Sequence, residues 1–162
     1  MKTAMKTLAA LWLCLLSFSP ALASEVGVWR LVSAVGVDEE SGETFDRFGA
    51  RPDGYLIFTE SGYMSVVINA EGREPLTGNP ETATEEQAGL FSTMTAHAGA
   101  YEIVDGRLIH PVDVAHDPAM VGKDLIREVS FISDDEIESI VPSFTTPSGR
   151  RVHLVLRWQR LN

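Results

Sequence analysis

The sequence is almost free of cysteine: Cys14 is the only one, and it lies in an apolar segment near the N-terminus. That segment has the layout of a secretory signal peptide, with Lys2 and Lys6 ahead of an apolar run from Leu8 to Leu16. An Ala-Leu-Ala motif ends at Ala23 and provides the small residues of a cleavage site. Cys14 would leave with this peptide, which excludes disulfides, a catalytic cysteine and a thiolate metal site from the mature protein.

Long apolar runs are scarce as well. The run near the N-terminus is too short to remain as a helix across a bilayer core of roughly 30 Å. No later segment approaches the roughly 18 apolar residues that a span requires. We therefore expect a cleaved signal peptide over residues 1–23 and a periplasmic or secreted domain over 24–162 without a membrane span. A chain of that length fits one domain with a sizeable core.

Basic residues are in the minority, with 13 Lys and Arg against 23 Asp and Glu, which gives a formal net charge of −10. Loss of Lys2 and Lys6 with the signal peptide takes this charge to −12. Binding to nucleic acid depends on basic patches that neutralise phosphates, so we expect no nucleic-acid partner. The same charge disfavours docking on an anionic membrane.

Common catalytic and metal-binding motifs are missing too. The sequence has no G-x-S-x-G elbow, P-loop, dinucleotide fingerprint or H-E-x-x-H motif. Two of the four histidines, His110 and His116, share a strand face but would lie roughly 20 Å apart at about 3.3 Å per residue. They could not bind one metal ion, so we expect no metal site. Because the cofactor-binding motifs are missing as well, we expect no cofactor.

From Val26 onward the sequence has apolar residues with a period of two, interrupted by short turns rich in Gly and Asp. The pattern predicts eight strands, over residues 26–37, 55–59, 63–69, 100–104, 107–115, 125–132, 136–141 and 152–160. An open antiparallel sheet of this size leaves exposed edges, which closure removes. We therefore predict an all-β protein, a single antiparallel up-and-down barrel of about eight strands. Such an interior holds side chains or one small ligand.

One segment departs from the strand pattern. Residues 84–87, Thr-Glu-Glu-Gln, match a capping box with acidic residues in the first turn. Leu90, Phe91 and Met94 follow at helical spacing. This predicts one short helix over 84–97 that caps a mouth of the barrel, either as a plug or as a lid.

The opening of the first strand, Gly27-Val28-Trp29-Arg30-Leu31, resembles the G-x-W strand of lipocalins and their relatives. Further stretches resemble the bacterial and fungal lipocalin-like domain family, in order 54–59, 62–66, 99–102, His110, 121–122, Arg127 and 156–158. The resemblance covers essentially all of the expected mature chain. It implies a barrel with an internal cavity and supplies no catalytic signature. The pair His97-Ala98 departs from the family, whose members tend to have an aromatic residue before the glycine that corresponds to Gly99. This departure implies an altered cavity mouth.

Alternation along the strands predicts which side chains face the interior. Leu108, His110, Val112, Val114 and His116 share one face, which is apolar except for its two histidines. Arg127 shares its face with apolar residues of the next strand, so we expect an inward-facing cation. The predicted ligand-binding residues are His110, Arg127, Tyr101, Met64, Phe58 and His116. Each histidine also has a second interpretation. His116 could be a loop residue that forms a hydrogen bond within its own turn, and His110 could be a buried core histidine whose hydrogen bonds are satisfied by the protein.

An inward arginine is costly unless something pairs with it. Three partners are open at this point: a carboxylate from Glu102 or Glu128, the ring face of Trp29, or a bound anion.

Three functional hypotheses arise from a mostly apolar interior with few polar groups. The first is binding of a small hydrophobic molecule, with its polar end held by Arg127 and His110. The second is a cofactor-independent isomerase, cyclase or hydratase, a class found among related barrels. There His110 would be the general acid-base, with Tyr101 or Arg127 polarising a carbonyl. The third is a structural or accessory barrel whose interior is filled.

Overall fold

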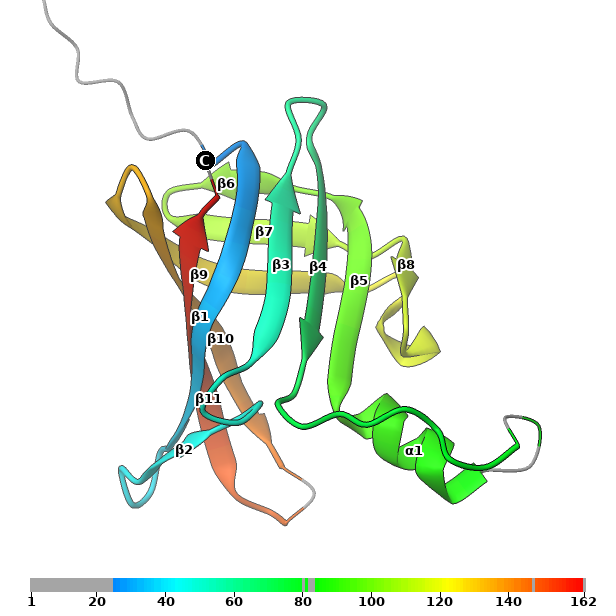
Figure 1. Ribbon diagram of the computed structural model, residues 1–162. Helices are drawn as coiled ribbons and strands as arrows, with labels where there is room; N and C mark the ends of the chain where they lie inside the picture. Colours follow the sequence, from blue (N-terminus) through cyan, green and yellow to red (C-terminus); the bar gives the residue numbers. More distant parts are fainter. Residues whose placement is uncertain (1–24, 80, 82–83, 147, 162) are drawn as a thin grey trace, which may run out of the picture.

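The computed structural model describes residues 25–79, 81, 84–146 and 148–161 (Figure 1). The expected signal peptide, residues 1–23, lies outside the described residues. The strands are β1 (Gly27–Asp38), β2 (Thr44–Asp46), β3 (Asp53–Phe58), β4 (Tyr63–Asn69), β5 (Met94–Ala100), β6 (Glu102–Val104), β7 (Arg107–Pro111), β8 (Val114–Ala115), β9 (Asp124–Ser133), β10 (Glu136–Thr145) and β11 (Arg151–Arg160). A helix, α1 (Thr84–Ser92), precedes β5, and a short 3-10 helix, η1 (Pro118–Met120), follows β8.

All pairings between named strands are antiparallel, and together they form a barrel. β6 pairs with β7 while β5 pairs with β8, so residues 94–104 and 107–115 form one kinked hairpin. If each arm of this hairpin is counted as one strand, the ladder has eight strands. It runs from β4 through the hairpin to β9, β10, β11, β1 and β3, and back to β4. The predicted all-β antiparallel barrel is confirmed, and β2, which pairs only with β1, is an addition to the eight predicted strands.

The kink in this hairpin explains one wrong assignment. Val112 is buried, but the strand is interrupted after Pro111 and resumes only at Val114. Such a break reverses the inside-outside alternation of the residues beyond it. Val114 is therefore 62% exposed instead of facing the interior with Leu108 and Val112 as the sequence predicted.

A glycine makes the kink possible. A Cβ atom at Gly99 would lie 2.2 Å from the carbonyl oxygen of Pro111 and 2.9 Å from the amide nitrogen of Asp113. That amide donates a hydrogen bond of 2.9 Å to the carbonyl of Ala98. The two arms of the hairpin thus approach each other more closely at this point than any side chain would allow.

The helix is shorter than the predicted 84–97. It ends at Ser92, and residues 94–97 belong to β5, where they pair with β4. Pairing between distant strands therefore overrides the helical spacing of Leu90, Phe91 and Met94. Figure 1 shows α1 beside the start of β5, pointing away from the barrel. Within residues 85–92 only Leu90 is partly buried, and none of these side chains lines the cavity inside the barrel.

The core is closed at the end of the barrel where β5 passes into β6. Trp29 and Phe58 are buried there, and the ring of Tyr101 lies 4.7 Å from that of Phe58. The hydroxyl oxygen of Tyr101 lies 3.3 Å from both the carbonyl oxygen of Thr59 and a carboxylate oxygen of Glu25, so its one proton can be donated to either acceptor. The side chains of Trp29, Phe58 and Tyr101 fill this end of the barrel, and none of the three lines the cavity inside it.

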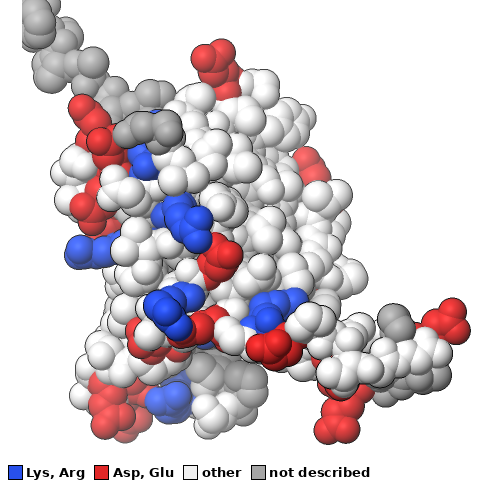
Figure 2. Space-filling model, in the orientation of Figure 1, with Lys and Arg blue, Asp and Glu red and all other residues white. Residues whose placement is uncertain are grey.

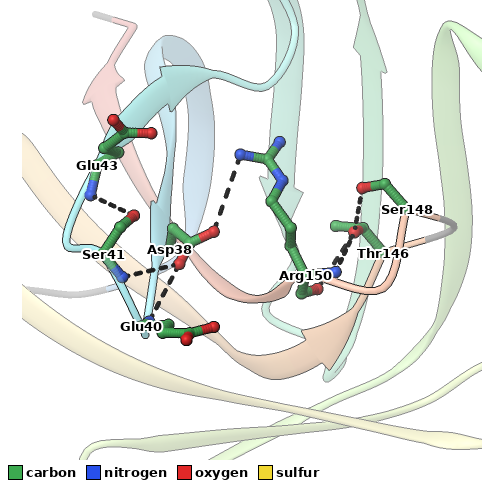
Figure 3. Close-up of polar contacts among 7 residues, drawn as sticks. All are labelled: Asp38, Glu40, Ser41, Glu43, Thr146, Ser148 and Arg150. Carbon is green, nitrogen blue, oxygen red and sulfur yellow. Dashed lines mark hydrogen bonds and ion pairs between the residues drawn. The ribbon is translucent and has the colours of Figure 1, made fainter.

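At the opposite end, an aspartate joins two hairpins (Figure 3). Asp38, at the end of β1, accepts hydrogen bonds from the amides of Glu40 and Ser41 at 3.0 and 3.1 Å. Its other oxygen lies 3.8 Å from the guanidinium of Arg150, in the turn between β10 and β11. These contacts hold the two hairpins that border the opening of the barrel.

Charge is unevenly spread on the outside. Figure 2 shows acidic and basic side chains gathered over the lower and left parts of one face, whereas its upper right part is nearly uncharged. Among the described residues, no helix has the length and apolar content needed to cross a membrane.

Candidate functional site

The barrel encloses a cavity of about 220 Å³. Its wall is built mainly from β4, β5, β7, β9, β10 and β11, and β4 and β11 each supply three apolar side chains in alternate positions. The apolar lining consists of Phe48, Leu56, Met64, Val66, Ile68, Leu108, Met120, Leu125, Val141, Phe144, Leu154, Leu156 and Trp158.

The polar lining is basic or neutral. It consists of Arg47, Thr95, His97, His110, Arg127 and Ser139. No lining residue is an aspartate or a glutamate, although the chain as a whole carries a formal charge of −10. The interior therefore has the opposite electrostatic character to the protein that surrounds it.

Arg127 faces the cavity from β9, as the alternation predicted, in register with Leu108 of β7. Its Nη1 atom donates to the carbonyl of Ile126 at 2.8 Å. No carboxylate in the described part of the chain lies within ion-pair distance of this guanidinium. Burial lowers the pKa of Arg127 to about 10, which still leaves the side chain charged at neutral pH.

Two of the partners expected for Arg127 are wrong. Glu102 and Glu128 are exposed on the outside of the barrel. The ring of Trp29 meets another cation, because the guanidinium carbon of Arg160 lies 4.0 Å from its centre. Neither of these two expected partners therefore meets Arg127.

The two lining histidines are joined to each other. Nδ1 of His97 lies 3.0 Å from Nε2 of His110, and Nδ1 of His110 lies 2.8 Å from the carbonyl oxygen of Ala100. A carbonyl only accepts, so a neutral His110 carries its proton on Nδ1 and accepts through Nε2. His97 must then donate from its own Nδ1. Both ring nitrogens of His110 are thus occupied, while Nε2 of His97 remains an acceptor.

Both histidines are held neutral by their surroundings. Burial lowers the pKa of His97 to about 3, and the nearby His110, Arg127 and His116 act in the same direction. Burial also lowers the pKa of His110, partly opposed by its bond to Ala100. Only 1% of His110 is exposed.

Sequence analysis overlooked His97 as a site residue because it placed residue 97 at the end of a helix. In the structure His97 lies on β5 between Ala96 and Ala98, and its ring turns into the barrel beside His110. One signal was available. Residues 95, 97 and 99 fall on the same face as Tyr101 of the predicted strand 100–104, so extending that strand toward the N-terminus would have turned His97 inward.

The other predicted site residues lie in three different places. Met64 lines the cavity with His110 and Arg127. Phe58 and Tyr101 pack together at the closed end and are not lining residues. His116 lies outside the cavity, where its Nδ1 accepts from the amide of Ala96 at 3.2 Å and its ring contacts Phe91.

Comparison with known proteins identifies one family. The model of the lipocalin-like domain matches residues 26–161, which is nearly all of the described chain. No curated protein matches the sequence. A redesigned β-barrel of known structure is 13% identical over 85% of this chain and 91% of its own, with a TM-score of 0.38. A likeness at that level adds nothing to the match with the family.

Proposed function

The chain belongs to the lipocalin-like domain family, and on this premise we propose that it is an exported protein that binds one small, mainly apolar molecule inside the barrel. An anionic end of that molecule pairs with Arg127. The observation that carries this proposal is the charged side chain of Arg127 in a cavity whose lining contains no carboxylate.

The size and lining of the cavity support an apolar ligand. Ligand pockets are concave, mostly apolar and supplied with a few convergent polar groups. At about 220 Å³, this cavity lies below the common range of roughly 300–1,000 Å³, which favours a small molecule. The open space also weighs against the alternative of a structural barrel with a filled interior.

The charge inside the cavity supports an anionic end. A buried charge is unfavourable unless it is paired, and a guanidinium presents two parallel donors that match a carboxylate. Arg47 adds a second, exposed cation to the lining, and its guanidinium carbon lies 4.7 Å from the centre of the Phe48 ring. An acid entering from the Arg47 side would meet positive charge on the way to Arg127.

The enzymatic alternative finds less support in the geometry. A general acid-base at His110 needs a ring nitrogen that faces the substrate, and both of its nitrogens are occupied by Ala100 and His97. Export is supported by the composition of residues 1–23 alone.

Native mass spectrometry of the protein purified gently from its host tests this proposal. We expect a bound molecule with an apolar body and an acidic group, released on denaturation. Arg127→Met, which keeps the length of the side chain and removes its charge, should release that molecule during purification. Arg51→Met is the matched control, since Arg51 is an exposed arginine paired with Glu71 outside the cavity. A bound molecule without an acidic group, or equal retention by Arg127→Met, would contradict the proposal.

A further inference from the structure

We propose that the cavity takes up an organic acid as its anion together with one proton, and that the His97–His110 pair holds this proton. The inference rests on the proposed function, because it specifies the ligand class of the same cavity. It also assigns His97, and not His110, as the histidine that contacts the ligand.

The hydrogen bonds leave one nitrogen of the pair free. His110 donates to Ala100 from Nδ1 and accepts from His97 at Nε2. The remaining nitrogen, Nε2 of His97, has no hydrogen-bond partner among the described residues. All buried side-chain nitrogens and oxygens in that part of the chain do have a partner, so Nε2 of His97 is accessible. His97 is also a lining residue of the cavity, so we assign this nitrogen as the atom of the pair that a ligand there contacts.

While the cavity is empty, most of the charged groups around the pair disfavour protonation of its imidazole rings. Arg127 faces both histidines, and His116 faces His97 from the hairpin arm that carries β8. The groups that favour a proton are the Ala100 carbonyl and the carboxylate of Asp113, and both act on His110. With a cation on one side and no carboxylate in the lining, the empty pair is neutral at neutral pH.

An anion bound to Arg127 reverses this balance. It neutralises the charge that disfavours a proton on both histidines and adds an opposite charge to the cavity. An opposite charge within about 4–6 Å raises the pKa of a histidine by about 1–3 units. A proton taken from solvent by Nε2 of His97 leaves the bonds to His110 and Ala100 in place and creates a new donor toward the anion. No rearrangement of the pair is needed.

Linkage sets the direction of the pH dependence. If the complex holds one more proton than the empty protein, affinity for the anion rises as pH falls, by up to tenfold per pH unit. The rise occurs between the pKa of the pair in the complex and its lower pKa in the empty cavity. An uncharged molecule of the same shape induces no proton uptake.

Isothermal titration calorimetry with 1-octanesulfonate tests this inference, because a sulfonate keeps its charge over the whole range used. Titrations near pH 6, where histidine ordinarily titrates, in buffers of different ionisation enthalpy give the number of protons taken up. We expect net proton uptake with octanesulfonate that increases as the pH is lowered, and none with 1-octanol. His97→Gln can still donate to His110 but cannot titrate, so it should abolish both the proton uptake and the rise in affinity for octanesulfonate as pH falls. His153→Gln, outside the cavity lining, is the control and should behave as the wild type.

The outcomes separate this inference from the proposed function. Arg127-dependent binding of octanesulfonate without proton uptake would overturn the inference and leave the proposed function standing. Unchanged uptake in His97→Gln would overturn the assignment of the proton to this pair. Absence of octanesulfonate binding at every pH from about 5.5 to 8 would overturn both. If His97→Gln does not fold, proton uptake by the wild type and an NMR titration of its imidazoles still decide the question.

Discussion

Nδ1 of His97 lies 3.0 Å from Nε2 of His110, so the two histidines of the cavity wall act as one hydrogen-bonded unit. The unit is anchored at one end, where His110 donates to the backbone of Ala100 at 2.8 Å, and open at the other, at Nε2 of His97. It connects the middle of β5 with β7 across the kinked hairpin. This arrangement gives the two rings different tasks, His110 as support and His97 as the group that a ligand meets.

Loss of His110 should destabilise the fold. His110→Ala leaves the carbonyl of Ala100 and the Nδ1–H of His97 without their partner in a buried place. An unsatisfied buried polar group costs about 1–3 kcal/mol, so we expect the free energy of unfolding to fall by about that much. Urea denaturation followed by circular dichroism measures it. His153→Ala, at a partly exposed position near Glu39, should cost less than about 1 kcal/mol. Equal effects of the two substitutions would refute the supporting role of His110.

The close approach at Gly99 should not tolerate a methyl group. Gly99→Ala would place its Cβ 2.2 Å from the carbonyl oxygen of Pro111, which is backbone and cannot turn away. Overpacking of this kind costs about 1–3 kcal/mol and would also displace His110, whose ring lies 3.3 Å from the same Cβ position. Gly89→Ala in α1 is the matched control, since no atom outside the helix backbone lies within 4 Å of its Cβ position. There the helix should gain about 0.5–1 kcal/mol. Thermal unfolding of both variants decides between these signs, and a neutral Gly99→Ala would contradict the close approach at the kink.

Asp38 should make stability depend on pH in the acid range. The amides of Ser41 and Glu40 lower the pKa of its carboxyl below 3.8, with a smaller contribution from Arg150. Because the folded pKa is the lower one, the contribution is present above the unfolded pKa. It is lost as pH falls through the folded pKa. Asp38→Asn should therefore be less stable than the wild type near neutral pH, and the difference should shrink as the solution is acidified below about pH 3.8.

Chemical denaturation at a series of pH values measures this difference. Asp46→Asn, at an exposed position on β2, serves as the control and should show no such trend. A stability difference for Asp38→Asn that stays constant down to strong acid would refute the role of its carboxylate at the hairpins.

Tryptophan fluorescence should report on the cavity through one residue. Trp158 lines the cavity and donates from Nε1 to Ser139 at 3.1 Å, whereas Trp29 is fully buried at the closed end. Addition of 1-octanol should change the emission of the wild type and of Trp29→Phe, because Trp158 remains in both. Trp158→Phe should lose the response. If the response depends on Trp29 instead, the alcohol binds at the closed end of the barrel, which would contradict the assignment of the cavity as the binding site.

The success of sequence reasoning differed along the chain, for physical reasons. The predicted strand 63–69 coincides with β4, and the interior position of Arg127 is correct, because these strands keep an unbroken alternation. Alternation is a local property, so it can be read without knowledge of the partners of a strand.

The contact between His97 and His110 could not be predicted in the same way. It depends on the pairing of 94–100 with β4, which overrides a local helical pattern, and on the kink beside Gly99. Both are properties of distant segments brought together. The same kink reversed the orientation of Val114 and left His116 outside the cavity.

The central claim, that Arg127 receives the anionic end of an apolar molecule, is tested most directly by a cycle of four affinities. Octanesulfonate and 1-octanol are each titrated into the wild type and into Arg127→Met by calorimetry. A charge-assisted hydrogen bond contributes about 1.5–3 kcal/mol, so the substitution should weaken sulfonate binding by about 10- to 100-fold. Octanol binding should change little, because its contacts are with the apolar wall. Equal losses for both molecules, or no loss for the sulfonate, would contradict the claim.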